Sequence, residues 1–433
     1  MQRIRTNEVQ AHLGERAKMA GWMHNWRDMG KFGFLVLRDG AGTFQAVLDS
    51  EAEMAKLRGL QFESVVEIEG IITPEPRAAA GAELHDCQIT VLSAVLEPLP
   101  FEINKKELKP GLDIFLDHAP LGLRHLQKRS LFRISAEIMA GFREYLGQQG
   151  FVEILTPKIV GSATESGANV FRIDYFDRPA YLAQSPQFYK QIMVGVFERV
   201  FEIGPVFRAE KHNTARHTNE YVSLDLEMGF IQDHRDVMAM LTNVLRYVFD
   251  RVRQVRKQEV ELLKLRVPEI GPSIPDLRLA EAQQIIFERH GEDCRGAPDL
   301  EPHQETWLCQ YAEEKLGSEF LFVTHYPTSK RPFYTMPDGQ DPSVTKGFDL
   351  LFRGCEIVTG GQRIHLYEQL LDSASKWGIH PQDIAGYLQA FKYGMPPHGG
   401  FAIGLERLLM QLAGLTNLRE TTLFPRDLDR LSP

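Results

Sequence analysis

The chain has 433 residues, of which 43% are hydrophobic and 25% charged, and its formal net charge is −9. This length exceeds one ordinary hydrophobic core, so we expect at least two domains. No apolar run is long enough to span a bilayer, which excludes a membrane-spanning protein, and the N-terminus lacks the apolar core of a signal peptide. We therefore expect a cytosolic protein. The negative charge argues against a nucleic-acid partner, although a local basic groove can exist within such a surface.

The four cysteines, Cys87, Cys294, Cys309 and Cys355, are scattered along the chain, and no two of them share CxxC spacing. Disulfide frameworks and structural zinc sites depend on cysteines at characteristic spacings. We therefore expect neither in this chain.

Residues 1–100 contain five short segments that have the composition of β-strands and are bounded by turn residues. They are Lys18–His24, Phe32–Arg38, Thr43–Leu48, Ser64–Ile72 and Gln88–Ser93, with a helix-like stretch at Ser50–Leu60. Five strands with a helix after the third predict a small β-barrel of the OB type. Such barrels bind single-stranded nucleic acid, with Phe34 as the candidate stacking ring and Arg27 and Gln45 as polar contacts. A purely structural or dimerisation module is an equally good interpretation of the composition.

Residues 101–117 are charged, contain a Pro-Gly break and predict a linker before a second domain at 118–433. That domain opens with a helix at Ser130–Gln149, in which apolar residues recur every three or four positions until Gly150 stops the pattern.

A strand at Phe151–Leu155 follows, and then a loop of small residues at 161–168 that contains one acid, Glu165. Such loops are often mobile lids, but a plain connector is equally compatible with the sequence. Three polar residues, Ser185, Gln187 and Lys190, cluster shortly afterwards.

Two strands joined by a polar loop are predicted at Val200–Phe230. The second strand alternates between Tyr221, Ser223, Asp225 and Glu227 on one face and Val222, Leu224, Leu226 and Met228 on the other. We expect the first strand to present Val206, Arg208 and Glu210 on one face, and the loop holds Arg216 and His217. One side of this hairpin needs a core, and the other is typical of a surface for a polyphosphate beside a flat base. A solvated sheet edge is the alternative for a lone hairpin.

Residues 260–320 show helices and loops without a chemical signature, and we interpret them as scaffold. A buried strand is predicted at Phe348–Ile357, followed by a turn at Thr359–Arg363. The last motif, Gly399–Arg407, predicts a glycine-flanked strand that enters a helix.

Two arginines on separate segments, Arg208 and Arg407, are suited to clamp a phosphate chain, because the planar guanidinium donates paired hydrogen bonds. Asp349 and Glu356 offer oxygen ligands for Mg²⁺. The sequence contains no Walker GxxxxGK[ST] motif, no kinase glycine loop and no nucleophilic triad. These observations indicate in-line displacement at phosphorus, run by positioning and charge neutralisation.

Three stretches resemble the signature motifs of class II aminoacyl-tRNA synthetases. They are SLFRISAEIMAGFREYLGQQGFVEILTPKI, FRAEKHNTARHTNEY and GGFAIGLERLLM, in that order. Within the class, the barrel-first order, QSPQFYKQ and EIVTGGQRIH are similar to aspartyl-tRNA synthetases, and KYGMPPHGGF with LFPRDLDRLSP to their short archaeal-like form. The resemblance implies an α+β protein with an N-terminal OB-fold barrel and a catalytic domain built on a mainly antiparallel sheet flanked by helices. It also implies a homodimer with the first motif at its interface.

The resemblance implies that ATP contacts residues of the second and third motifs. These are Arg208 at the α-phosphate, Glu210 at the adenine amino group, Tyr221 on the ring, Arg216 and His217 near the γ-phosphate, and Gly404 and Arg407 on the opposite side. Glu356, between these motifs, is also expected to bind ATP. Arg208 and Arg407 are the expected catalytic residues. The cofactor implied is Mg²⁺, held by Asp349 and Glu356 with Thr359 where relatives more often carry serine. The added methyl group of Thr359 leaves the hydroxyl in place.

The amino acid implied is L-aspartate. Its ammonium group is expected among Glu165, Ser185, Gln187 and Asp225, with Thr359 nearby, and its side chain against Lys190 and Arg363. An amide side chain would leave both cations unpaired, and asparaginyl relatives typically lack the lysine. Asparagine is therefore the lesser alternative.

The tRNA anticodon is expected at His24, Arg27, Phe34 and Gln45 of the barrel. His24 stands where relatives specific for tRNA(Asp) tend to carry tryptophan, which suggests an enzyme that charges both tRNA(Asp) and tRNA(Asn). For His24 itself, the alternative is a barrel-surface histidine without a role. For the protein, the alternatives are a synthetase for tRNA(Asp) alone, an asparaginyl-tRNA synthetase, an asparagine synthetase-like paralogue and a non-catalytic relative.

Overall fold

The computed structural model describes residues 2–78, 80–161, 169–211 and 214–432. The chain divides into two compact units, Met1–Gly111 and Leu112–Pro433. The domain boundaries expected from the sequence stay a prediction, and the last six residues of the expected linker form helix α2, which opens the second unit. Among the described residues, no helix is long and apolar enough to cross a membrane.

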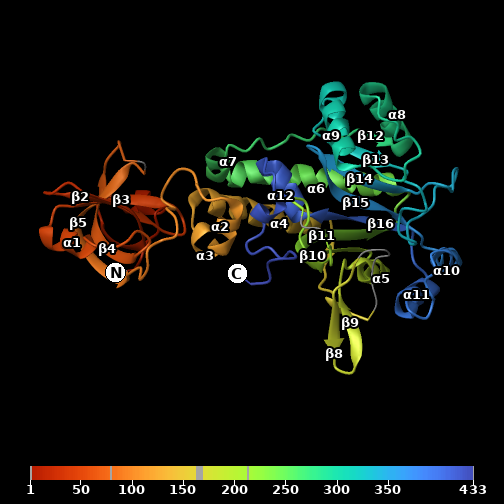
Figure 1. Ribbon diagram of the computed structural model, residues 1–433, viewed down its shortest axis with the longest axis horizontal. Coiled ribbons are helices and arrows are strands. Elements are labelled where there is room, and N and C mark those ends of the chain that lie inside the picture. Colours follow the sequence, from red (N-terminus) through yellow and green to blue (C-terminus); the bar gives the residue numbers. More distant parts are fainter. Residues whose placement is uncertain (1, 79, 162–168, 212–213, 433) are drawn as a thin grey trace. The chain divides into compact units, whose positions relative to one another are not determined.

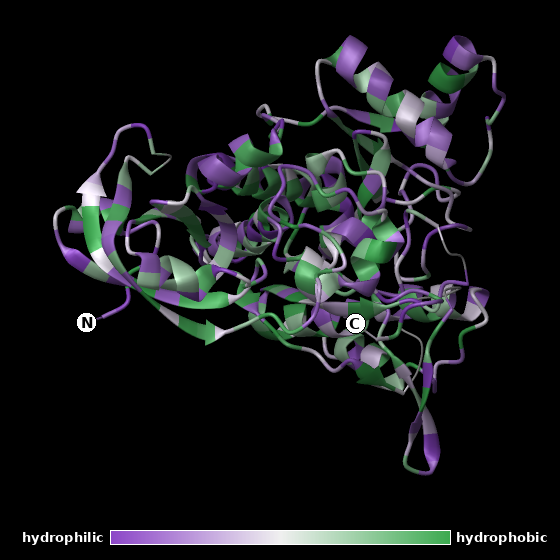
Figure 2. Cartoon of the chain, turned by 60° about the vertical axis from the view of Figure 1, so that its left-hand side comes forward, coloured by the Kyte–Doolittle hydropathy of each residue, from purple (hydrophilic) through white to green (hydrophobic). Residues whose placement is uncertain are grey.

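The first unit is a closed five-stranded barrel with the strand order β1-β2-β3-β5-β4 (Figure 1). Its strands are β1 (Arg16–Asp28), β2 (Gly33–Arg38), β3 (Thr43–Leu48), β4 (Val65–Pro74) and β5 (Ala82–Ser93), and α1 (Glu51–Leu57) follows β3. The predicted OB-type barrel is confirmed. Alternate strand residues point inward, so that Phe44, Ala46 and Leu48 of β3 are buried. Hydrophobic and hydrophilic residues accordingly alternate along the barrel strands (Figure 2).

The second unit is built on an eight-stranded sheet with the order β12-β13-β14-β15-β16-β11-β10-β6. All neighbours are antiparallel except the pairs β6–β10 and β12–β13. The strands are β6 (Val152–Glu153), β10 (Arg199–Phe207), β11 (Glu220–Gly229), β12 (Asp276–Arg278), β13 (Phe320–Thr324), β14 (Gly347–Phe352), β15 (Cys355–Arg363) and β16 (His398–Gly404). A separate small sheet contains β7 (Ile159–Val160), β9 (Arg178–Leu182) and β8 (Arg172–Tyr175).

Helices cover the sheet and its edges. They are α2 (Leu112–Asp117), α3 (Ala119–Gly122), α4 (Leu126–Gln148), α5 (Gln187–Phe197), α6 (His234–Val255), α7 (Lys257–Leu263), α8 (Leu279–His290), α9 (Pro302–Tyr311), α10 (Tyr367–Lys376), α11 (Ala385–Lys392) and α12 (Leu405–Ala413). The α+β class predicted from the sequence is confirmed.

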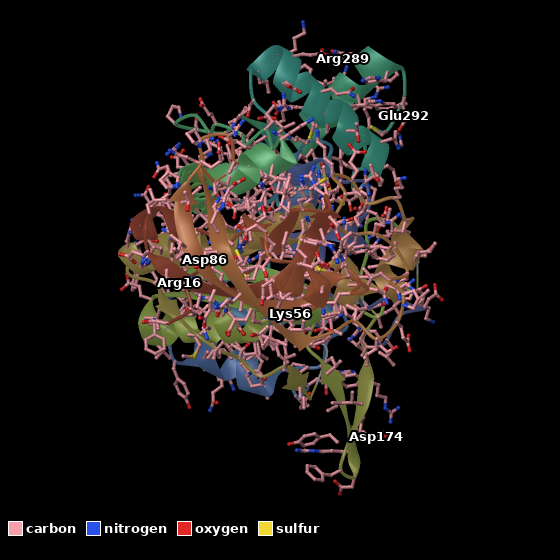
Figure 3. All side chains as sticks on the ribbon, turned by 90° about the vertical axis from the view of Figure 1, so that its left-hand side faces the viewer. Arg16, Lys56, Asp86, Asp174, Arg289 and Glu292 are labelled. Carbon is pink, nitrogen blue, oxygen red and sulfur yellow. The ribbon has the colours of Figure 1, made fainter. Side chains whose placement is uncertain are left out.

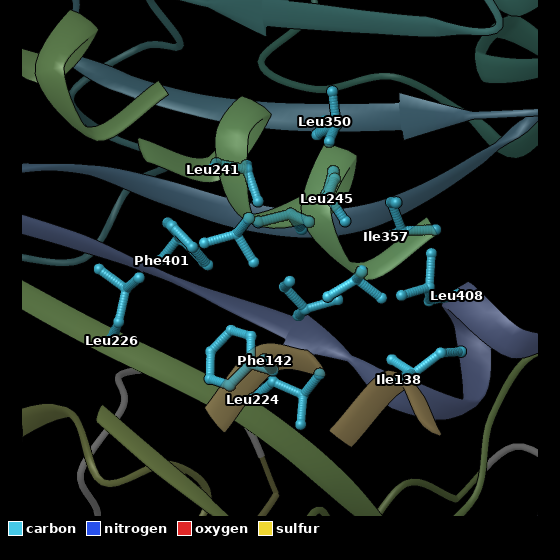
Figure 4. Packing of buried hydrophobic residues seen from close by; sticks show 14 of the residues in the cluster. Ile138, Phe142, Leu224, Leu226, Leu241, Leu245, Leu350, Ile357, Phe401 and Leu408 are labelled. Carbon is cyan, nitrogen blue, oxygen red and sulfur yellow. The ribbon is translucent and has the colours of Figure 1, made fainter. Parts of the chain in front are cut away.

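One face of the large sheet packs against α4, α6 and α12 in a continuous apolar core. Figure 4 shows Phe142 of α4 and Leu241 of α6 in the same cluster of buried side chains as Leu224 and Leu226 of β11. The spacing of apolar residues along α6 places one stripe on the sheet, and Asp233 caps its first turn by accepting the N–H of Arg235. Because this face of β11 is filled by core, its polar face is left for a site.

Two predictions for the strands near this face are wrong. The stretch Phe348–Ile357 forms two antiparallel strands rather than one, because Arg353 and Gly354 adopt positive φ and reverse the chain between β14 and β15. The expected turn at Thr359–Arg363 belongs to β15. A Cβ atom on Gly360 would lie 2.4 Å from the ring of Phe348, so this glycine is needed for close packing.

A third correction concerns the first strand of the hairpin. Strand β10 ends at Phe207, so Arg208 and Glu210 lie in the loop that follows. The N–H of Glu210 binds the carbonyl of Arg208 at 2.8 Å, a local bond that turns the chain away from the strand.

Candidate functional site

A cavity of about 290 Å³ opens on the polar face of the large sheet. Most of the residues expected from the sequence to bind ATP or the amino acid line it. They are Ser185, Gln187, Lys190, Arg208, Glu210, Arg216, His217, Tyr221, Glu356, Thr359, Arg363, Gly404 and Arg407. Segments more than 200 residues apart in sequence therefore meet around one space.

Four charged residues form what we call the buried charge cluster: Lys190, Asp225, Glu227 and Arg363. The Lys190 Nζ atom lies 2.9 Å from Asp225 Oδ1 and 3.6 Å from Glu227 Oε2, and Arg363 Nε lies 2.9 Å from Glu227 Oε1. Each of these four residues is at most 5% exposed. Burial of single charges costs several kcal/mol each, so two cations and two carboxylates stabilise one another here.

A glycine makes room for this cluster on the neighbouring strand β16. A Cβ atom at Gly400 would lie 2.2 Å from Glu227 Oε2, and the carbonyl of Gly400 accepts a hydrogen bond from Arg363 Nη2 at 3.0 Å. The glycine-rich motif is therefore required for packing of the charges as well as for the cavity wall.

Polar groups beside the buried charge cluster extend it toward the cavity. The hydroxyl of Ser223 donates to Asp225 Oδ2, so this carboxylate is held by both a cation and a hydroxyl. The side-chain amide nitrogen of Gln187, at the start of α5, is buried and has no hydrogen-bond partner among the described residues. A buried donor left unpaired in a cavity wall is suited to a ligand.

We call the other part of the cavity the arginine end; it contains Arg208, Arg216, Tyr221, Glu356 and Arg407. The guanidinium carbon of Arg208 lies 5.6 Å from the centre of the Tyr221 ring. Arg407 donates from Nη1 to the carbonyl of Glu356 at 3.1 Å, and the same nitrogen lies 3.6 Å from Glu356 Oε2. Three guanidinium groups gathered in one part of the cavity favour a polyanionic ligand.

Two carboxyl groups around the arginine end have strongly raised pKa values. Burial, with nearby Glu356 as the second cause, raises the pKa of Glu305 to about 7. Burial also raises the pKa of Glu406 to about 7, although this side chain accepts the N–H of Val222 at 3.0 Å. Glu406 thereby fixes the start of β11 beside Tyr221.

The three expected metal ligands come from adjacent strands. Asp349 of β14 is paired with Thr359 of β15 in the strand register, and the Thr359 hydroxyl donates to Glu356 Oε1 at 2.8 Å. Asp349 forms an ion pair with Arg331 through Oδ2, whereas its buried Oδ1 has no hydrogen-bond partner among the residues that the structure describes. The described part of the chain contains no group of three or more His, Cys, Asp or Glu residues placed to hold a metal. The candidate set is thus two carboxylates and one hydroxyl.

Two of the expected residues that the structure describes, Asp225 and Asp349, do not line the cavity. Both are buried, and they are held by Lys190 and Arg331 respectively. Glu165 lies outside the described residues.

Sequence reasoning assigned no role to several residues of this region. Glu227 lies in the buried charge cluster, Arg331 and Tyr334 line the cavity, and Glu406 supports β11. Alternation along β11 already placed Glu227 beside Asp225, so its role was within reach of the sequence. Arg331 carried no such signal because it lies in a loop, and its partner Asp349 is 18 residues further along the chain.

The barrel residues expected at the anticodon lie on the outer side of β1, β2 and β3. Arg27 pairs with Phe34 in the β1–β2 register, and its guanidinium carbon lies 5.8 Å from the Phe34 ring centre. Gln45 donates to Glu83 Oε1 at 2.6 Å. His24 occupies a β-bulge between Met23 and Asn25, which re-aims a side chain relative to the regular strand.

Family comparisons agree with this division into a barrel and a catalytic unit. Residues 112–428 match the model of class II tRNA synthetases (D, K and N), and residues 17–94 match that of the OB-fold nucleic acid binding domain. The chain belongs to the class II tRNA synthetases of the D, K and N group.

Within this class, similar full-length relatives are named as aspartate–tRNA ligases. The aspartate–tRNA(Asp/Asn) ligase of Deinococcus radiodurans is 46% identical over all of this chain and 99% of its own, and that of Thermus thermophilus is 45% identical over the full length of both. The aspartate–tRNA(Asp) ligase of Pyrococcus furiosus is 39% identical over 99% of each chain.

Solved structures are similar over the whole length as well. Asparaginyl-tRNA synthetase from Pyrococcus horikoshii, complexed with asparaginyl-adenylate, matches with a TM-score of 0.92 and 31% identity over all of both chains. Aspartyl tRNA synthetase from Entamoeba histolytica matches with a TM-score of 0.86 and 31% identity over all of this chain and 93% of its own. Backbone similarity therefore does not distinguish a synthetase for aspartate from one for asparagine. The side chains of the site must make this distinction.

Proposed function

We propose that the protein is an aspartate–tRNA ligase. It activates L-aspartate with ATP to aspartyl-adenylate and pyrophosphate, and then transfers the aspartyl group to the 3′ end of tRNA. The observation that carries this proposal is the pair of buried cations, Lys190 and Arg363, in a cavity whose other end is rich in arginine. Full-length relatives named as aspartate–tRNA ligases support it.

The buried charge cluster is assigned to the amino acid. The aspartate side chain binds Lys190 and Arg363, while its ammonium group binds near Asp225, Ser185 and Gln187. The substrate thus brings a carboxylate to two cations and a cation to one carboxylate, which keeps every buried charge compensated. Asparagine would bring the ammonium group without a side-chain carboxylate and so leave one positive charge uncompensated in this buried cluster. An uncompensated buried charge costs about 3–5 kcal/mol. The sequence also assigns Glu165 to the ammonium group, and Thr359 to its surroundings.

The arginine end is assigned to ATP. Arg208 contacts the α-phosphate, Tyr221 stacks on the adenine and Glu210 accepts from its amino group. Arg216 and His217 hold the γ-phosphate, with Arg407 and Gly404 on the opposite side.

The reaction of the first step is an in-line displacement. An oxygen of the aspartate α-carboxylate attacks the α-phosphorus of ATP. The bond between this phosphorus and the oxygen that bridges it to the β-phosphate breaks, and pyrophosphate leaves. Arg208 and Arg407 are the catalytic residues because they neutralise the charge that develops on the α-phosphate oxygens. Held in place by both ends of the cavity, the two substrates react at high effective concentration.

We assign Mg²⁺ to Asp349, Glu356 and Thr359. The oxygen-only donor set suits this hard cation, and the buried Oδ1 of Asp349 has no hydrogen-bond partner in the described part of the chain. When bound, the ion neutralises phosphate charge. Arg331 holds the other oxygen of Asp349 and thereby orients the carboxylate.

The barrel is assigned to the anticodon, with Phe34 stacking on a base and Arg27, Gln45 and His24 contacting its neighbours. We propose that both tRNA(Asp) and tRNA(Asn) are charged, because the bulge at His24 presents a smaller ring than tryptophan to the third anticodon base. The chain divides in this account into the barrel at 1–100, a linker at 101–117 and the catalytic domain at 118–433. We further propose a homodimer joined through the first motif and acting in the cytosol.

Aminoacylation of purified transcripts tests the proposal. Labelled aspartate should be incorporated into both tRNA(Asp) and tRNA(Asn) transcripts, and not into a tRNA(Lys) transcript used as control. Incorporation into tRNA(Asp) alone would refute the dual specificity but keep the ligase. Incorporation of asparagine in preference to aspartate would refute the assignment of the amino acid. Free asparagine formed without tRNA would instead indicate an asparagine synthetase-like enzyme.

A further inference from the structure

The segment of residues 276–316 contains β12, α8, α9 and a short π-helical turn at Ala312–Leu316. We call it the α8–α9 segment; its two helices lie at the top of Figure 1 and carry both hydrophobic and hydrophilic residues in Figure 2. The sequence showed no chemical signature here. The structure nevertheless brings one of its carboxylates, Glu305, to the arginine end of the cavity.

Glu305 stands on the first turn of α9, whose start is well defined. Pro302 occupies the first helical turn, and Glu301 and Gln304 form a reciprocal capping box. The Glu305 side chain is only 14% exposed. Its backbone position is thus set by the cap rather than by a flexible loop.

Two residues of the cavity wall contact this carboxylate. Arg216 Nη1 lies 3.7 Å from Glu305 Oε2, and the N–H of Glu356 donates to the same oxygen at 3.3 Å. Arg407 donates to the carbonyl of Glu356, so the Glu356 backbone is held between α9 and α12.

The three residues differ in their relation to the cavity. Arg216 and Glu356 line it and Glu305 does not, so Glu305 contacts the guanidinium without itself lining the ligand space. A phosphate can therefore reach Arg216 without displacing Glu305. Arg216 itself is on the irregular loop between β10 and β11, where a long side chain is otherwise costly to order.

We propose that Glu305 is a positioning residue that holds the Arg216 guanidinium ready for the terminal phosphates of ATP. The inference rests on the proposed function for the identity of the nucleotide. Glu305 does not touch the reacting atoms; it acts through Arg216, and it spares the ligand the cost of ordering that side chain. Immobilising one such side chain is worth about threefold to tenfold in affinity.

Glu305→Gln isolates this role. The amide oxygen still accepts the N–H of Glu356, but the charge that attracts Arg216 is gone. The matched control is Glu314→Gln, because Glu314 forms an ion pair in the same segment with Arg289, the residue labelled at its outer end in Figure 3.

Calorimetric titration in Mg²⁺ buffer with α,β-methylene-ATP and with AMP provides the readout, at a pH well above the Glu305 pKa of about 7 so that the carboxyl is ionised. The Kd of Glu305→Gln for α,β-methylene-ATP should rise about threefold to tenfold, while its Kd for AMP, which lacks the terminal phosphates, stays within twofold. Glu314→Gln should match the wild type with both ligands. In an Arg216→Ala background the further change Glu305→Gln should shift the Kd for α,β-methylene-ATP by less than about twofold.

The outcomes separate this inference from the proposed function. Equal losses for AMP and the triphosphate analogue, a loss that persists without Arg216, or no loss at all would overturn the positioning role. A wild type that binds α,β-methylene-ATP but shows no aspartate-dependent pyrophosphate exchange would overturn the proposed amino acid, and the titrations would still decide on Glu305. A wild type that binds no nucleotide would overturn both.

Discussion

The charged groups at the two ends of the cavity differ in their solvent exposure and in how they are paired. In the buried charge cluster, Lys190 and Arg363 meet Asp225 and Glu227 at 2.9–3.6 Å, with almost no solvent exposure. At the arginine end, the side chains of Arg216 and Arg407 are 35% and 29% exposed.

This difference separates selection from catalysis. Buried charges on strands and a helix cannot be screened or moved, so they discriminate a ligand by whether it completes their pairing. Guanidinium groups that are about one third exposed, on a loop and at a helix start, can close around a flexible triphosphate. They stabilise the negative charge that develops during the reaction. We therefore expect substitutions at the two ends to change different kinetic constants.

The largest effect is expected at the arginine end. Arg208→Ala should lower the rate of aspartate-dependent ATP–pyrophosphate exchange by about 10³-fold, because it removes charge stabilisation at the transferring phosphorus. Arg199→Ala is the control, since Arg199 lies on the same strand-loop unit but packs over Phe151, away from the cavity. Near-normal exchange by the Arg208 variant would contradict the assignment of this end to the nucleotide.

At the buried end, Lys190→Met keeps the aliphatic length of the side chain and removes its charge. We expect kcat/KM for aspartate to fall about 10²-fold, because Asp225 and Glu227 lose a shared partner and the substrate carboxylate loses one of two cations. The Kd for α,β-methylene-ATP should change less than twofold.

Lys158→Met is the matched control for this prediction, because Lys158 forms a similar ion pair with Glu202 at 2.6 Å and does not line the cavity. Equal losses of aspartate and nucleotide affinity in the Lys190 variant would show that the two ends are not separable.

The barrel provides an intermediate effect that leaves both ends unchanged. Phe34→Ala should raise KM for tRNA about tenfold, since stacking of a base on an aromatic ring is worth about 1–3 kcal/mol. Pyrophosphate exchange, which needs no tRNA, should be normal in the same preparation. A loss of exchange in this variant would place Phe34 in a structural role instead.

The smallest expected effect is on the pH dependence of stability and concerns Glu406. The carboxyl group of this residue is buried and forms no ion pair among the described residues. Its pKa in the folded protein is about 7, above the ordinary value of 4.5. The unfolded chain therefore releases the proton first as the pH rises, and the stability contributed by this group falls between pH 4.5 and pH 7.

Glu406→Gln should remove this fall, which amounts to about 1–3 kcal/mol. Thermal melting followed by circular dichroism should show that the variant gains a few degrees relative to wild type between pH 5 and pH 8. A difference in Tm that is constant with pH would contradict the raised pKa.

Local patterns predicted much of this molecule. Alternation along β11 separated Leu224 and Leu226, which pack in the core, from Tyr221 and Ser223, which line the cavity. Turn residues and strand lengths were sufficient for the barrel, because closure of five short strands has few solutions.

Long-range contacts were beyond such reasoning. Glu305 meets Arg216 only because the α8–α9 segment folds back over the sheet, and Arg331 meets Asp349 of β14 from the loop between β13 and β14. The Gly360-Gly361 pair is typical of a turn in sequence, yet both residues belong to β15. Glycine is needed at position 360 because side-chain atoms of Phe348 and Phe401 occupy the space that a Cβ atom would need. A sequence pattern does not report which neighbour requires a glycine.

The central claim is that Lys190 and Arg363 select a carboxylate side chain, and pyrophosphate exchange with the free amino acids tests it most directly. With equal concentrations of each amino acid and saturating ATP, the account predicts that aspartate supports exchange with a kcat/KM at least about 10²-fold above that for asparagine. Equal rates for the two amino acids, or a preference for asparagine, would contradict it.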